Sequence, residues 1–418
     1  MTQNHGTAQL APLRADLSSP APTARRGRLT GRPALYLLAS LVVSLLAASA
    51  APTPLYAIYQ RMWGFTPITI TIVFGVYAVA VLAALLTLGR LSDSVGRRPV
   101  LLTALAVQVV AMVVYATAGG VGELMGARII QGLATGAALG AIGAGMLDVD
   151  RERGALFNAL APGLGTGSGA LISALVVQFL PAPTHLIYLA LVGVFVLQAI
   201  GVVLLRETVT PVPVTASVFT PEVRLPRAVR GRVLAAAPVL FASWALAGLY
   251  AALGPSIVQA LTGSGNVVLG ASSLTVLAGT AVAASYLLRT VPARTVLLWG
   301  IGALVTGVAI TLIALGAGSL ALFFVGTAVS GVGFGAGFQG GIRTVVPLAA
   351  PHERAGVLSL LYVISYLGMG VPAVAAGFGA TDGLGLLGAA RVYGLALIVL
   401  AGLALAGLRR TRPARALA

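Results

Sequence analysis

Long apolar runs of about 20 residues alternate with short polar stretches along most of the chain. A helix of that length covers the ~30 Å hydrocarbon core of a bilayer, so each run is predicted to cross a membrane once. The pattern predicts twelve such helices, at residues 34–57, 68–88, 99–118, 122–146, 155–180, 185–205, 233–254, 267–289, 294–315, 319–347, 356–379 and 388–408. The expected fold class is therefore an all-α membrane protein with twelve transmembrane helices.

Composition agrees with this prediction and explains the charge. Hydrophobic residues make up 58% of the chain and charged residues 9%, a balance that no soluble domain of this length could bury. Every basic residue apart from histidine is arginine, and most lie in alternate loops and the two tails. Because short Arg-rich loops stay inside, we expect a bacterial plasma-membrane protein with both termini cytoplasmic. The formal charge of +16 then reflects topology, and the lipid bilayer rather than nucleic acid is the expected partner.

Proline and arginine interrupt the apolar pattern between the sixth and seventh runs. Such a stretch cannot continue a helix and is predicted to link two bundles. The predicted organisation is a disordered cytoplasmic tail at 1–32, an N-terminal six-helix bundle at 33–205, a cytoplasmic linker at 206–232, a C-terminal six-helix bundle at 233–408 and a basic cytoplasmic tail at 409–418.

The two halves carry weak internal repeats. Glu152-Arg153 before the fifth run matches Glu353-Arg354 before the eleventh. The glycines of the fourth run parallel those of the tenth, namely Gly132, Gly136 and Gly140 against Gly331, Gly333, Gly335, Gly337 and Gly341. Two similar halves are typical of transporters that bind cargo at the interface between halves, near the membrane midplane.

One polar turn, from Gly89 to Pro99, has a distinctive spacing of glycine, acid and arginine. It resembles the loop signature between helices two and three of the major facilitator superfamily. The residues that fit are Gly89, Leu91, Ser92, Asp93, Gly96, Arg97 and Arg98, whereas Ser94 replaces the usual basic residue. The resemblance implies two pseudo-symmetric six-helix bundles and a conformational switch at Gly89, Asp93, Gly96, Arg97 and Arg98. The alternative is an Arg-rich turn that only sets topology.

Asp93 is the acidic residue of this turn. When the halves close on the cytoplasmic side, we expect it to face the N-terminus of the eleventh helix near Gly356, where a carboxylate is stabilised. Protonation of Asp93 would weaken that contact. Arg97 is expected to pair with Asp148 or Asp150. The alternative is a set of plain surface ion pairs, which contribute little.

Arg128 lies inside the fourth run, where a charge should face the bundle interior and mark a pathway. Gln131 and Thr135 share its helical face by spacing. Arg128-Ile129-Ile130-Gln131-Gly132 resembles the superfamily motif of that helix, which implies proton coupling through Arg128 together with Asp93. An arginine that snorkels to the interface is the alternative. Glu123, near the outer mouth, is interpreted as a solvated helix start.

In the fifth run, Gly154, Gly163 and Gly167 resemble the first part of the antiporter motif of drug exporters, although Ser168 replaces its proline. Such spacings also arise by chance in a glycine-rich chain. Polar and aromatic residues at mid-span are the candidates for a substrate pathway, and each has a packing role as its alternative. They are Tyr77, Gln131, Thr135, Trp244, Phe338, Gln339, Tyr362 and Tyr366.

Near the end of the first run, Pro52 and Pro54 should loosen the helix. The following Tyr56, Tyr59 and Trp63 are interpreted as an interfacial aromatic belt, with an outer gate as the alternative.

No enzyme is indicated, because the chain has no cysteine, no phosphate-binding loop and no clustered metal ligands. We expect no metal and no cofactor. The predicted function is secondary active transport, as proton-coupled efflux of small, mostly apolar or amphiphilic compounds by a monomer. The alternatives are an uptake symporter for a small polar solute or sugar, and a transport-inactive membrane sensor.

Overall fold

The computed structural model describes residues 28–227, 229–350, 352–381 and 383–410. In this part of the chain, twelve helices are long and apolar enough to cross a membrane. They are α1 Gly31–Ala50, α3 Pro67–Leu88, α5 Arg97–Thr117, α6 Val121–Val149, α7 Arg151–Phe179, α8 Pro183–Leu204, α9 Arg230–Thr262, α10 Val267–Leu287, α11 Ala293–Ala317, α12 Leu320–Val345, α13 Arg354–Thr381 and α14 Gly385–Arg410. The shorter elements are α2 Tyr56–Trp63, α4 Leu91–Val95, and the 3₁₀ turns η1 Ala216–Phe219 and η2 Val346–Leu348. The predicted count of spans is confirmed.

Two of the predicted spans end more than four residues from the observed helix end, and both differences lie at prolines. The first helix stops at Ala50 instead of residue 57, because Pro52 and Pro54 break it into a turn before α2. The seventh continues past Pro255 to Thr262 instead of ending at 254. Pro255 cannot donate to the carbonyl of Ala251, and the Thr53 hydroxyl donates to that carbonyl instead, at 3.2 Å. A neighbouring side chain thus keeps this helix continuous.

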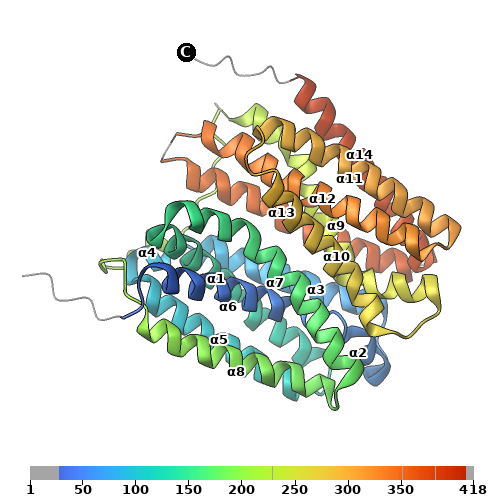
Figure 1. Ribbon diagram of the computed structural model, residues 1–418, viewed down its shortest axis with the longest axis horizontal. Helices are drawn as coiled ribbons and strands as arrows, with labels where there is room; N and C mark the ends of the chain where they lie inside the picture. Colours follow the sequence, from blue (N-terminus) through green and yellow to red (C-terminus); the bar gives the residue numbers. More distant parts are fainter. Residues whose placement is uncertain (1–27, 228, 351, 382, 411–418) are drawn as a thin grey trace, which may run out of the picture.

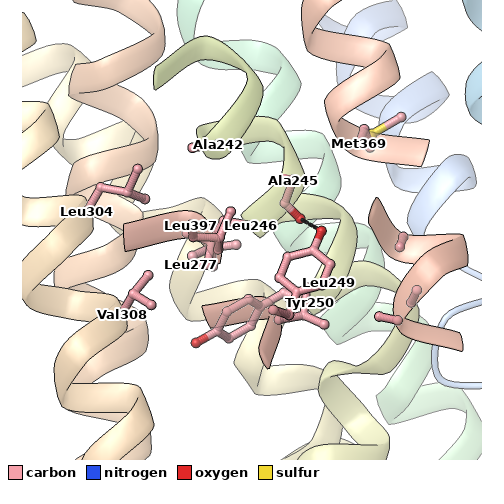
Figure 2. Packing of buried hydrophobic residues seen from close by; sticks show 14 of the residues in the cluster. Ala242, Ala245, Leu246, Leu249, Tyr250, Leu277, Leu304, Val308, Met369 and Leu397 are labelled. Carbon is pink, nitrogen blue, oxygen red and sulfur yellow. Dashed lines mark hydrogen bonds between the residues drawn. The ribbon is translucent and has the colours of Figure 1, made fainter. Parts of the chain in front are cut away.

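The spanning helices form two six-helix bundles, and the core of the second half continues across the interface to residues of the first, such as Phe74 and Tyr77. Helices α1, α3 and α5 to α8 form the first half, and α9 to α14 form the second (Figure 1). Figure 2 shows the core of the second half, where Leu246 and Tyr250 of α9 pack among leucines and Val308 of neighbouring helices. The Tyr393 hydroxyl donates to the Ala245 carbonyl at 2.7 Å within this core.

Glycine contacts give the repeat a structural basis. A Cβ atom on Gly136 of α6 would lie 2.4 Å from the Val81 carbonyl oxygen of α3. A Cβ on Gly335 of α12 would lie 2.3 Å from the Ala281 carbonyl oxygen of α10. Only glycine permits such close helix approach, so equivalent helix pairs in the two halves pack in the same way.

The tails predicted at 1–32 and 409–418 fall mostly outside the described residues, which exclude 1–27 and 411–418. Within the described part, the backbone N–H groups of Arg28 and Leu29 donate to the Leu204 carbonyl, and α1 begins at Gly31. Residues 28–32 are therefore ordered against the end of α8.

The two ends of the bundle differ in charge. We call the end that carries Gly89–Arg98 and the linker between α8 and α9 the arginine-rich face, and the end that carries α2 the opposite face. The halves meet along two seams, α3 with α13 and α7 with α10. In the first seam, Cβ atoms on Gly377 and Gly75 would lie 2.1 Å from Thr71 and 3.0 Å from Val374. These contacts belong to the half of α3 nearer the opposite face.

Candidate functional site

Arg128 is the largest fully buried side chain and lies inside the first half, with no exposed surface. Its guanidinium donates to the Ser49 carbonyl at 2.8 Å, to Gln131 Oε1 at 2.9 Å and to the Tyr56 hydroxyl at 2.5 Å. The Tyr115 hydroxyl donates to the same Gln131 oxygen at 3.0 Å. The predicted burial of Arg128 on one face with Gln131 is confirmed, and the snorkelling alternative is wrong.

Three tyrosine rings surround this guanidinium. The Arg128 Cζ atom lies 5.8, 5.1 and 5.9 Å from the ring centres of Tyr56, Tyr77 and Tyr115. Ring faces attract a cation, by about 0.5–2 kcal/mol each depending on desolvation. Four helices of the first half, α2, α3, α5 and α6, therefore converge on one charge.

Among the residues that the structure describes, no carboxylate lies beside Arg128. The acidic residues in the described ranges lie at helix ends or in loops, and they are Asp93, Glu123, Asp148, Asp150, Glu152, Glu207, Glu222 and Glu353. Several buried polar atoms beside the guanidinium also have no hydrogen-bond partner in the described part of the chain. They are Arg128 Nε, Gln131 Nε2 and Thr135 Oγ1. The site is thus cationic and rich in donors.

An aromatic cluster lies on the second half. The Trp244 ring centre is 6.0 Å from Phe334, 5.4 Å from Phe338 and 5.2 Å from Tyr366. Tyr366 and Tyr77 belong to one packed cluster that spans both halves. The structure therefore brings Trp244, Phe338 and Tyr366 together.

The other predicted pathway residues divide between the halves. Tyr77 and Gln131 contact the guanidinium of Arg128, and Thr135 is fully buried one turn beyond Gln131. Tyr362 is half-buried on α13, one turn before Tyr366. Gln339 lies apart from these residues, because its amide donates to the Ser285 carbonyl of α10 at 3.2 Å.

The hairpin between α3 and α5 is organised by Arg97. Its side chain, 11% exposed, pairs with Asp93 and with Asp148, the latter at 3.3 Å. The predicted pairing with Asp148 is confirmed, whereas Asp150 caps α7 by accepting from the backbone of Glu152 and Arg153. Gly96 has φ +102°, a conformation that favours glycine.

The linker completes this hairpin and joins it to α13. Glu207 accepts from the backbone N–H groups of Arg97 and Arg98 at 3.0 and 2.9 Å, which caps the start of α5. Arg90 pairs with Glu222 at 3.1 Å. The Arg224 backbone N–H donates to the Gly356 carbonyl at 3.2 Å.

Asp93 does not contact the first turn of α13 in this structure. Its side chain is 59% exposed and pairs within its own hairpin, while Arg224 of the linker packs against Gly356. We expect Asp93 to contact α13 only when the arginine-rich face is closed. In this structure, the close glycine contacts between α3 and α13 lie toward the opposite face instead.

The three glycines of the antiporter-like motif have two environments. Gly154 packs within the first half, where a Cβ would lie 2.4 Å from the Met146 carbonyl oxygen. Gly163 and Gly167 lie on the α7–α10 seam, where Cβ atoms would lie 2.4 Å from Val282 and 3.2 Å from Ala278. Two of the three glycines therefore permit close contact between the halves.

The sequence did not predict Ser49, Tyr56 and Tyr115 beside Arg128, because these contacts depend on how helices distant in the chain pack; Tyr56, for example, returns to the bundle only through the turn at Pro52. The belt interpretation is wrong for Tyr56 and Tyr59, which are 3% and 1% exposed. Burial raises the pKa of the Tyr59 hydroxyl to about 12, so it stays neutral. It donates to the Tyr188 hydroxyl at 3.2 Å. Glu123 is exposed and accepts from the backbone of Gly119, as expected for a solvated helix start.

Comparison with known proteins identifies the fold. The profile of the Major Facilitator Superfamily matches residues 36–371. A bacterial homologue of the human lysosomal transporter Spinster, solved in an inward-facing and unoccupied conformation, has a TM-score of 0.72 at 14% identity. That match covers 91% of this chain and 98% of the homologue. A variant of the nucleoside transporter NupG has a TM-score of 0.65 at 14% identity, covering 89% of this chain and 98% of NupG. No curated protein sequence matches the chain.

Proposed function

Because the chain belongs to the Major Facilitator Superfamily of secondary transporters, we propose that it exports small, mostly apolar or amphiphilic compounds in exchange for protons. It acts as a monomer in a bacterial plasma membrane, with cargo at the interface of the two halves. The arginine-rich face is cytoplasmic, because short loops rich in arginine stay inside. Both chain ends then lie in the cytoplasm.

The observation that carries this proposal is the difference in chemistry between the buried residues of the two halves. The first half offers one buried cation with polar neighbours, Arg128 and Gln131. The second half offers the half-buried aromatic cluster around Trp244. Tyr77 and Tyr366 lie between them. An apolar site with few convergent polar groups suits a molecule with an apolar body and one polar end.

Coupling to protons is assigned to Asp93 together with Arg128. Asp93 is largely exposed and pairs with Arg97, so protonation can reach it from solvent and would free part of that guanidinium. In the state closed on the cytoplasmic side, Asp93 docks at the first turn of α13, where a helix N-terminus stabilises a carboxylate by about 0.3–2 kcal/mol. Arg224 must leave Gly356 for this docking, which links the linker to the switch.

Export is supported by the position of the antiporter-like glycines. Gly163 and Gly167 lie where α7 of the first half meets α10 of the second, and the Thr275 hydroxyl donates to the Gly167 carbonyl at 3.1 Å. This seam must form and separate in each transport cycle. Close packing there stabilises the conformation in which the seam is formed and so changes the populations of the two conformations.

The test is flux through the purified protein in sealed vesicles, with an imposed pH gradient and fluorescent dyes of negative, zero and positive charge. We expect dye movement that requires the gradient and reverses when the gradient is reversed. Dye and protons moving in the same direction would favour the uptake symporter. Dye binding without any movement would favour the sensor, and movement that ignores the pH gradient would contradict proton coupling.

A further inference from the structure

The charge of Arg128 has no counterion in the described part of the chain. The ion pairs found there all lie near the arginine-rich face, and the partners of Arg128 are a carbonyl, an amide oxygen and a phenol. Buried charges are usually paired, because removing an ion from water is costly. The tyrosine rings reduce this cost through their ring faces but carry no net charge.

The hydrogen-bonding groups near Arg128 are unbalanced toward donors. Gln131 Oε1 already accepts from both Arg128 and Tyr115. Arg128 Nε and Gln131 Nε2 are donors without a partner among the described residues. A carboxylate, sulfonate or phosphate can accept several such bonds and pairs with a guanidinium through two oxygens. A cation or an apolar group would leave these donors unmet.

We infer that Arg128 and Gln131 bind an anionic group at one end of the transported amphiphile, while the aromatic cluster around Trp244 holds its apolar body. This inference rests on the proposed function, because it specifies that the exported compound carries a negative charge. A lipid headgroup has the same chemistry and is separated from cargo in the test below.

Access to Arg128 depends on Tyr77. The Tyr77 ring lies over the guanidinium, is 5% exposed and packs in the cluster shared with Tyr366. Its neighbours Gly75 and Ala78 form the α3–α13 seam against Val374 and Gly370. When this seam separates, Tyr77 loses its support from the second half, so anion binding and seam opening are linked.

The test compares two probes with the same apolar body, anilinonaphthalene sulfonate and neutral phenylnaphthylamine. Each is titrated at equilibrium onto the full-length protein in phosphatidylcholine nanodiscs, and binding is measured by energy transfer from tryptophan to the naphthalene. Signal from empty nanodiscs is subtracted. We expect the wild type to bind the sulfonate about tenfold or more tightly than the neutral probe.

The decisive variant is Gln131→Glu, which has the same shape and places a carboxylate beside Arg128. We expect it to remove the preference for the sulfonate and to leave binding of the neutral probe within about twofold of the wild type. Arg128→Lys keeps the charge and should retain part of the preference. Arg391→Gln is the control, because Arg391 also donates to a backbone carbonyl, that of Leu315, but lies in the second half.

Equal binding of the two probes by the wild type would overturn the inference, as would an unchanged preference in Gln131→Glu. Loss of sulfonate binding when phosphatidylglycerol is added would assign the site to a lipid headgroup and also overturn it. These titrations use no gradient, so they are independent of the flux test. Failed flux with a clear anion preference would reject the proposed function alone.

Discussion

Arg97 divides its guanidinium between two carboxylates, and this arrangement gives Asp93 a defined partner in the present state. Both pairs lie near the surface, where an ion pair typically contributes about 0–1 kcal/mol to stability. The Asp93 pair can therefore break at little cost. Asp93 therefore suits a switch better than a structural role, because its pairing with Arg97 and its docking at the first turn of α13 differ little in free energy.

Asp93→Asn tests this role at the residue scale. We expect the variant to fold normally, with a free energy of unfolding within about 1 kcal/mol of the wild type, because Asp93 is largely exposed and Arg97 keeps its pair with Asp148. Its flux should no longer change with cytoplasmic pH, since the carboxyl to which proton coupling is assigned is gone. The measurement is flux against pH in vesicles.

The control for Asp93→Asn is Asp150→Asn, which removes a carboxylate from the same face. Asp150 caps α7 and does not pair with Arg97, and asparagine caps helices about as well as aspartate, so this variant should stay within about 1 kcal/mol of the wild type in stability and keep its pH response. A normal pH response in Asp93→Asn would contradict the assignment.

At the scale of elements, glycine decides where helices of the two halves can touch. Gly163 and Gly167 allow α7 to approach α10, and Gly75 and Gly377 do the same for α3 and α13. The α3–α13 contacts lie toward the opposite face, whereas the contact of Gly163 with Val282 lies near the middle of α7. Added volume at a seam should therefore disfavour this conformation more than it disfavours the fold of either half.

Gly163→Ala is the corresponding prediction. The new Cβ would lie 2.4 Å from Val282, and we expect a cost of about 1–3 kcal/mol to the closed seam. Labelling of a cysteine at Thr275→Cys should then become about tenfold faster. Gly279→Ala is the matched control, because a Cβ there meets nothing within 4 Å. Equal labelling rates in both alanine variants would contradict the seam account.

The sequence allowed prediction of those elements that depend on local pattern. Apolar runs located the twelve helices, and the spacing of Arg128 and Gln131 placed them on one helical face. The pattern did not reveal the continuous helix through Pro255, because its support comes from Thr53 in the other half. The tyrosine surroundings of Arg128 also depend on contacts distant in the sequence, although within one half, since Tyr56 reaches it only after the chain turns back at Pro52.

For the whole molecule, the linker is more than a tether between two bundles. Glu207 caps α5, Glu222 pairs with Arg90, and Arg224 packs on the first turn of α13. The linker therefore contacts both halves on the arginine-rich face, while the close glycine contacts between α3 and α13 lie toward the opposite face. The central claim of this account is that the two halves exchange these contacts, closing one face as the other opens.

Distances between spin labels on the two halves test that claim most directly. The chain has no cysteine, so introduced pairs are the only labelled sites. One pair, Thr69→Cys with Phe378→Cys, reports on the opposite face. The other, Thr87→Cys with Ala355→Cys, reports on the arginine-rich face. When the pH is raised or an amphiphilic dye is added, we predict that the first distance lengthens while the second shortens. Two distances that stay fixed, or that change in the same direction, would contradict the account.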